Sequence, residues 1–118
     1  MDAFTRQYIA TALWSSMDNA GDQGGEPLDA NYGPDDIAPE TLASMMEDCQ
    51  AFQRDHQDDI ALDPERAGHD FWLTRNHHGA GFWDGDWPHE VGQHLTAASH
   101  VYGGVDLYVG DDGLIHGT

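Results

Sequence analysis

The side chains that could do chemistry are densest between residues 69 and 84. Imidazole and carboxylate groups bind divalent transition metals, so a Zn²⁺, Mn²⁺ or Fe²⁺ site is one interpretation of this stretch. Its candidate ligands are His69, Asp70, His78 and Asp84. The spacing matches neither a His-Glu-x-x-His helix nor a paired Cys or His motif, so the alternative is a turn whose histidines contact neighbouring carboxylates. We rank that alternative first and expect no cofactor.

The other reactive residue types favour structural roles. Arg75 is one of four arginines in a chain rich in carboxylates, which favours a structural ion pair over substrate binding. Cys49 lies on the apolar side of a predicted helix, where a buried thiol is expected. The chain contains no Gly-x-Ser-x-Gly elbow and no Gly-rich phosphate loop. A non-enzymatic protein is therefore the preferred interpretation.

Hydrophobic periodicity and turn residues predict a single α+β domain over residues 1–118. Apolar residues three and four positions apart predict three helices, whereas aromatic runs and Gly-containing turns predict two β-hairpins. The predicted elements are helices over 2–16, 39–59 and 88–102, hairpins over 69–84 and 105–116, and an acidic Gly/Asp/Pro-rich loop over 17–34. The order α-α-β-β-α-β-β predicts a small antiparallel sheet with the helices packed on one face.

The predicted helix over residues 39–59 separates apolar from acidic side chains. With about 100° between successive residues, the two sets fall in opposite arcs, each roughly 120° wide. The apolar arc contains Leu42, Met45, Met46, Cys49, Phe52 and Ile60. The acidic arc contains Glu40, Glu47, Asp48, Asp55, Asp58 and Asp59. We therefore expect one face of this helix in the core and a stripe of carboxylates in solvent.

The chain as a whole is strongly acidic. Its 118 residues include 22 Asp and Glu but only four Arg and no Lys, which gives a formal charge of −18. Residues 18–63 hold thirteen of the acids and one Arg. Nucleic-acid binders and readers of anionic membranes need a basic surface, so this composition excludes both classes. No apolar run is long enough to span a bilayer and the start lacks a signal peptide, so we expect a cytoplasmic protein with a cationic partner.

Two neighbouring stretches carry a distinctive motif, AGHDFWLTRN over residues 67–76 and HGAGFWD over residues 78–84. Shorter stretches add to it at residues 8–14, 27–29, 35–38 and 106–113. This pattern resembles a family of small acidic proteins encoded by bacteriophages and bacterial mobile elements. The resemblance implies a phage protein acting in the host cytoplasm, and it carries over no catalytic residue.

Phage context and localised negative charge together predict an inhibitor of a host defence system. A DNA-binding channel of a CRISPR surveillance complex or a restriction enzyme attracts an anionic surface strongly, so the chain is expected to act as a DNA mimic. The expected contact residues are the six acids of the predicted helix together with Asp35 and Asp36. Two alternatives remain open. The first is a non-enzymatic protein whose acidic surface serves as a binding module or as an adaptation to high salt. The second is a small metal-binding enzyme that uses the His/Asp cluster.

Overall fold

The computed structural model describes residues 1–18 and 25–118. Within these residues the chain combines four α-helices with two short pairs of antiparallel strands. The helices are α1 (Ala3–Ser15), α2 (Pro39–Ile60), α3 (Pro64–Arg75) and α4 (His89–Val101). Strand β1 (Met17–Asp18) pairs with β2 (Glu26–Pro27), and β3 (Leu107–Val109) pairs with β4 (Ile115–Gly117). Single turns of 3-10 helix lie at Leu28–Ala30 and Pro34–Asp36. The fold is thus mixed helix and strand, as predicted, but helices dominate it.

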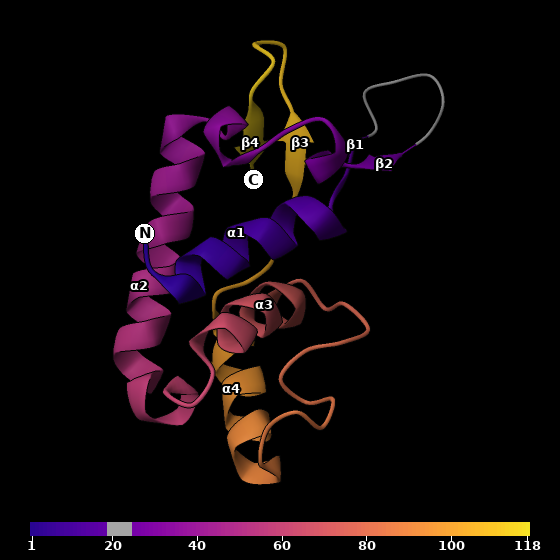
Figure 1. Ribbon diagram of the computed structural model, residues 1–118. Helices are drawn as coiled ribbons and strands as arrows, with labels where there is room; N and C mark the ends of the chain where they lie inside the picture. The colour runs from indigo at the N-terminus through magenta and orange to yellow at the C-terminus, as the bar shows by residue number, and fades with distance from the viewer. Residues whose placement is uncertain (19–24) are drawn as a thin grey trace.

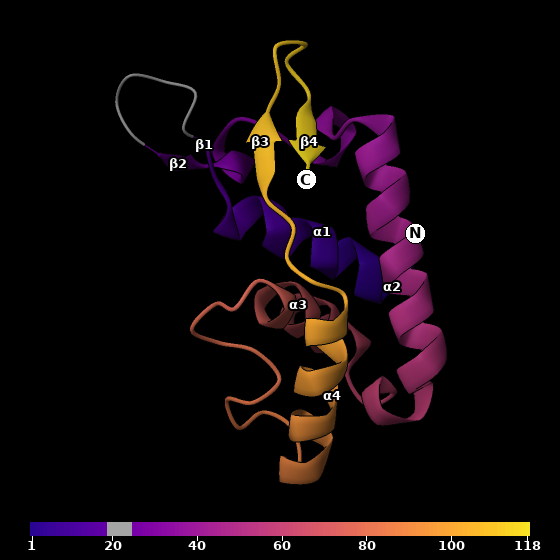
Figure 2. The ribbon, with the colours of Figure 1, turned by 180° about the vertical axis from the view of Figure 1, so that it is seen from behind.

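The molecule is elongated, with extents of 44 × 25 × 21 Å. Helix α1 crosses it between the β3–β4 hairpin and the pair α3 and α4, while α2 runs along one side (Figures 1 and 2). The core lies between the helices rather than on a sheet. At its centre the ring of Phe52 stacks on Phe71 with 4.2 Å between centroids, and Phe4 and Phe82 lie within 6 Å of it.

The three predicted helices, over 2–16, 39–59 and 88–102, are confirmed as α1, α2 and α4, and local signals explain where they begin or end. Asp2 caps α1, because its side chain accepts a hydrogen bond of 2.9 Å from the backbone N–H of Thr5. Pro39 occupies the first turn of α2, where its missing N–H costs no helical hydrogen bond. Helix α4 follows Pro88 and ends before Gly103, whose φ of +74° suits glycine.

The hairpin predicted over residues 69–84 is wrong. Residues 64–75 form helix α3, capped by Asp63, and residues 76–88 connect it to α4 without regular structure. Eight of the twelve residues of α3 are buried, and they include the polar residues Asp70, Thr74 and Arg75. Burial therefore does not follow a single apolar stripe, and the 3.6-residue pattern is weak. A helix buried on several sides gives the same short apolar run as a strand. The predicted element order is wrong for this reason.

Close packing of α3 against α1 depends on Gly68. A Cβ atom at this position would overlap the backbone carbonyl oxygen of Phe4. The two helices therefore approach more closely than any side chain at residue 68 would allow. The rings of Tyr8 and Trp72 then meet edge to face across the contact, with centroids 5.4 Å apart.

The second predicted hairpin is confirmed at the end of the chain. Strands β3 and β4 pair antiparallel with Val109 opposite Ile115, and Gly113 in the turn has a φ of +79°. The hairpin is fixed to the start of α2, because the backbone N–H of Ala38 donates to the carbonyl oxygen of Ile115 at 2.8 Å. It lies at one end of the molecule, so the predicted packing of all helices on one sheet face is wrong (Figure 1).

Candidate functional site on helix α2

The outer face of α2 presents the predicted carboxylates to solvent. Glu40, Glu47, Asp55 and Asp58 are exposed. In the described part of the chain Glu47 and Asp58 have no ion pair, whereas Asp55 meets the exposed Arg54 at 3.3 Å. The opposite face buries Met45, Cys49 and Phe52, which fixes the helix against the core. The structure therefore holds several carboxylates outward on one helix that is packed against the core.

Asp48 belongs to the predicted stripe but is engaged inside the molecule. Its Oδ2 atom accepts a hydrogen bond of 2.9 Å from Nη1 of Arg75, and only 31% of its side chain is exposed. At about 100° per residue, Asp48 lies on the edge of the acidic arc nearest Met45 and Phe52. That position lets it reach under the helix to a cation in the core. Asp48 is therefore a structural residue more than a member of the exposed stripe.

Arg75 confirms the predicted structural ion pair and is more heavily bonded than that prediction implied. Its side chain is 3% exposed. Besides Asp48, its guanidinium donates to the hydroxyl of Tyr8 at 3.0 Å and to the backbone carbonyls of Gly103 at 2.8 Å and Tyr102 at 3.1 Å. A planar guanidinium can satisfy four acceptors at once, which a lysine ammonium cannot. One buried cation thus joins α1, α2, α3 and the segment after α4.

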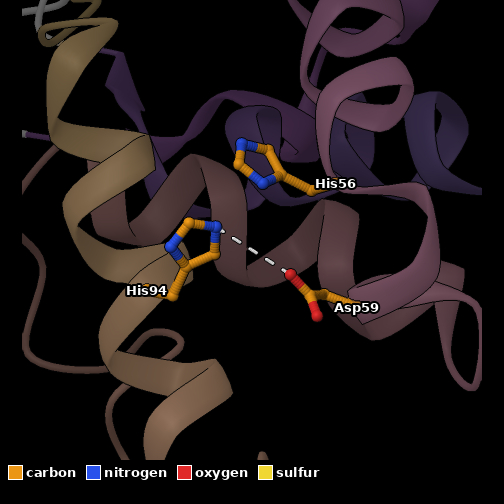
Figure 3. Close-up of side chains that lie close together, drawn as sticks. All are labelled: His56, Asp59 and His94. Atoms are coloured by element: carbon orange, nitrogen blue, oxygen red, sulfur yellow. Dashed lines mark ion pairs between the residues drawn. The ribbon is translucent and has the colours of Figure 1, made fainter.

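Asp59 lies on the same edge of the stripe as Asp48 but near the end of α2, beside two histidines that sequence reasoning missed. Its Oδ2 atom is 3.9 Å from Nε2 of His94 on α4. The rings of His94 and His56 meet at 68°, with centroids 5.2 Å apart. Figure 3 shows the three side chains directed into one space between the two helices. Each offers a ligand atom, and the three atoms lie within 4.8 Å of one another.

His56 has an unusual setting in α2. Its φ of −129° and ψ of 24° interrupt the helical geometry four residues before the helix ends. Burial, reinforced by the neighbouring His94, lowers the pKa of His56 below its ordinary value of 6.5, and Asp55 and Asp59 offset only part of that shift. Burial therefore disfavours the protonated form of the His56 imidazole. Its Nδ1 atom is buried and has no hydrogen-bond partner in the described part of the chain.

A sequence signal for His56 was present. At about 100° per residue it falls in the middle of the apolar arc, between Phe52 and Ile60. A histidine on the buried face of an amphipathic helix needs a polar partner there. The identity of that partner depends on how α4 docks, which the sequence pattern does not give.

The four candidate ligands predicted between residues 69 and 84 are not brought together. His69 shares a hydrogen bond of 2.8 Å with the hydroxyl of Thr11, and His78 is exposed. Asp70 is buried and accepts a hydrogen bond of 2.7 Å from the indole N–H of Trp87. Asp84 accepts from the backbone N–H of Gly81 at 3.2 Å. In the described ranges the three-residue group able to hold a metal is His56, Asp59 and His94 instead.

The remaining predicted residues have clear positions. Asp35 and Asp36 form the 3-10 turn just before α2, where Asp35 is exposed and Asp36 accepts from the backbone N–H of Gly33 at 2.8 Å. Cys49 is buried as predicted, and its burial raises the pKa of the thiol. A thiol held protonated in the core is a poor nucleophile, which agrees with its predicted structural role.

Comparison of the chain with models of protein families, with curated proteins and with solved structures found no match. Among the described residues, none of the helices combines the length and the apolar character that crossing a membrane requires.

Proposed function

We propose that this protein is a phage-encoded inhibitor that occupies the cationic DNA-binding surface of a host defence complex, either a CRISPR surveillance complex or a restriction enzyme. The outer face of α2 makes the contact in place of DNA. The observation that carries the proposal is a row of exposed carboxylates on a helix whose opposite face is fixed in the core.

The length of this row of carboxylates suits a surface that binds DNA. From Glu40 to Asp59 the helix rises about 28 Å, a length that covers roughly eight phosphates of one DNA strand. The exposed acids Glu40, Glu47, Asp55 and Asp58 mark out this length, and Asp35 and Asp36 precede it in the chain. Placement on a helix matters because groups that are already ordered lose little entropy on binding.

The net charge of −18 adds a long-range contribution to this short-range match. Oppositely charged surfaces raise the association rate, and docking on a DNA-binding channel releases the counterions of both partners. Of the four arginines, Arg75 is buried and Arg54 and Arg66 already pair with carboxylates, so little positive charge opposes the approach.

A charge-reversal experiment tests the proposal. The variant Glu40→Lys/Glu47→Lys/Asp58→Lys changes three exposed acids of α2, of which Glu40 lies 4.0 Å from Nδ1 of His116 and the other two have no ion pair in the described residues. The control Glu65→Lys/Glu90→Lys/Asp111→Lys makes the same change in net charge at exposed acids elsewhere. Displacement of a fluorescent DNA duplex from a purified surveillance complex and from a restriction enzyme is measured by anisotropy for both variants and the parent protein.

We expect the α2 variant to lose displacement and the control to retain most of it, and displacement by the parent to weaken as salt rises. Equal loss in both variants would show that only total charge matters, as in a general acidic module. Full activity of the α2 variant would rule out this face. Unfolding free energies that rise steeply for all three proteins in molar salt, without displacement, would instead favour adaptation to high salt.

A further inference from the structure

We propose that His56, Asp59 and His94 bind a divalent transition-metal ion, Zn²⁺ in the first instance, between the end of α2 and the middle of α4. The three side chains come from two helices and converge on one space (Figure 3). Their ligand atoms lie within 4.8 Å of one another. This inference does not depend on the proposed function, because it concerns the inner edge of α2 and not its exposed carboxylates.

The geometry needs only small side-chain movements to become a metal site. Ligand atoms about 2.1 Å from a tetrahedral Zn²⁺ stand roughly 3.4 Å from one another. The Oδ2 atom of Asp59 and the Nε2 atom of His94 are 3.9 Å apart already. Both side chains are partly free to move, since 37% of Asp59 and 60% of His94 is exposed. Rotation of the Asp59 and His94 side chains, with His56 held in place, would bring the three ligand atoms to the spacing that Zn²⁺ requires.

His56 is the fixed member of the group. Its ring packs on Phe52, with 4.6 Å between centroids, and meets the ring of His94 on another side. The ring nitrogen next to Cγ is Nδ1. In Figure 3 it lies on the side of the His56 ring that faces His94 and Asp59. A ligand on a packed ring is held in place before the ion arrives, which favours binding.

The unpartnered Nδ1 atom of His56 points independently to a ligand. It is the single buried side-chain nitrogen or oxygen in the described residues without a hydrogen bond. Leaving such a group unsatisfied destabilises the folded state, so native proteins retain few of them. A metal ion that accepts the lone pair of this nitrogen would remove that destabilisation.

Two imidazoles and one carboxylate suit Zn²⁺ and Fe²⁺ rather than Ca²⁺ or Mg²⁺, which prefer oxygen ligands. Three protein ligands leave at least one coordination position for water. The bound ion would tie the last turn of α2, beyond its interruption at His56, to α4. The acidic surroundings, including Asp55 and Asp58, favour a cation there.

The test must separate this site from general cation binding by an acidic protein. Metal-free protein is titrated with Zn²⁺ by calorimetry in millimolar Mg²⁺, which occupies non-specific carboxylates. The test variants are His94→Ala and Asp59→Asn, because both side chains are partly exposed and their replacement leaves the core intact. His78→Ala is the matched control, since it removes an exposed imidazole outside the group.

We expect one Zn²⁺ per chain in the parent and in His78→Ala. Each test variant should weaken binding by at least about 100-fold, since losing a ligand should exceed the 10- to 100-fold effect of losing an outer-shell partner. Added Zn²⁺ should raise the melting temperature of the parent and the control but not of His94→Ala. Binding that persists in both test variants, that Mg²⁺ abolishes, or that His78→Ala weakens equally would overturn the site. Circular dichroism spectra matching the parent would confirm that the variants are folded.

Discussion

Helix α2 turns one face to solvent along its 22 residues, whereas eight of the twelve residues of the following helix α3 are buried. On α2 the outward carboxylates Glu47 and Asp58 have no ion-pair partner in the described residues. On α3 the polar side chains are satisfied: Asp70 accepts from Trp87, the hydroxyl of Thr74 accepts from the backbone N–H of Phe82, and Arg75 donates to four groups. Charge on α2 is thus available to a partner, whereas polarity on α3 holds the fold together.

The largest difference in stability should be between substitutions of Arg75 on α3 and of Arg54 on α2. Arg75→Met removes the buried cation and leaves the carbonyls of Tyr102 and Gly103 without their donors, so we expect a loss of about 3–5 kcal/mol in the free energy of unfolding. Arg54→Met removes an exposed pair and should change that free energy by less than about 1 kcal/mol. Urea denaturation of both variants measures the difference. Similar effects for the two would contradict the distinction between the helices.

A somewhat smaller effect is expected where α3 meets α1. Gly68→Ala places a methyl group against the Phe4 carbonyl oxygen, a backbone atom that cannot rotate away, so we expect a loss of about 3 kcal/mol despite the better helix propensity of alanine. Gly79→Ala is the matched control, because a Cβ there meets nothing within 4 Å. Thermal denaturation should show a lower melting temperature than the parent's for Gly68→Ala, and an unchanged one for Gly79→Ala. An unchanged melting temperature would mean that the helices are not in tight contact.

The smallest effect concerns pH and the buried carboxyl of Asp70. Burial raises the pKa of Asp70 above its ordinary value of 3.8, and the hydrogen bond from Trp87 offsets part of that shift. The folded state therefore holds this proton to higher pH than the unfolded state. The resulting stability is fully present below pH 3.8 and is lost as the pH rises through the raised pKa.

Asp70→Asn should remove this contribution. The unfolding free energy of the variant is compared with that of the parent between pH 3 and pH 7. We expect the substitution to destabilise the protein more at pH 3 than at pH 7. Asp58→Asn on the exposed face of α2 serves as the comparison at neutral pH, where it should change stability by less than about 0.5 kcal/mol. A difference between parent and Asp70→Asn that stays constant with pH would show that Asp70 does not titrate differently in the folded state.

The same contrast explains how far sequence reasoning reached. Helix α2 was predicted because its apolar and acidic residues separate cleanly, and the β3–β4 hairpin because an Asp-Gly pair marks its turn. Helix α3 was missed because burial on several sides removes the periodicity on which such a prediction depends. The sequence predicts that Arg75 pairs with a carboxylate. It does not predict that the partner is Asp48, because that depends on how α2 and α3 pack.

The candidate metal site shows the same limit. The position of His56 on the apolar arc of α2 could have been recognised from the sequence, and Asp59 three residues later is its natural neighbour. His94 could not be assigned, since nothing in the periodicity of α4 specifies the side of α2 it meets. The predicted ligands failed for the complementary reason, because α3 directs His69 and Asp70 to separate partners, Thr11 and Trp87.

The bonds made by Arg75 also bear on how the chain folds. They reach from Tyr8 near the start to Gly103 near the end, so its acceptors are separated by most of the sequence. Contacts between distant residues form only after long stretches of chain have closed into loops, which slows folding and makes it cooperative. A fragment that ends at Val101 would retain all four helices yet leave the guanidinium short of two acceptors, the carbonyls of Tyr102 and Gly103. We therefore expect the chain to fold as one unit, with no stable helical subdomain that survives removal of its last residues.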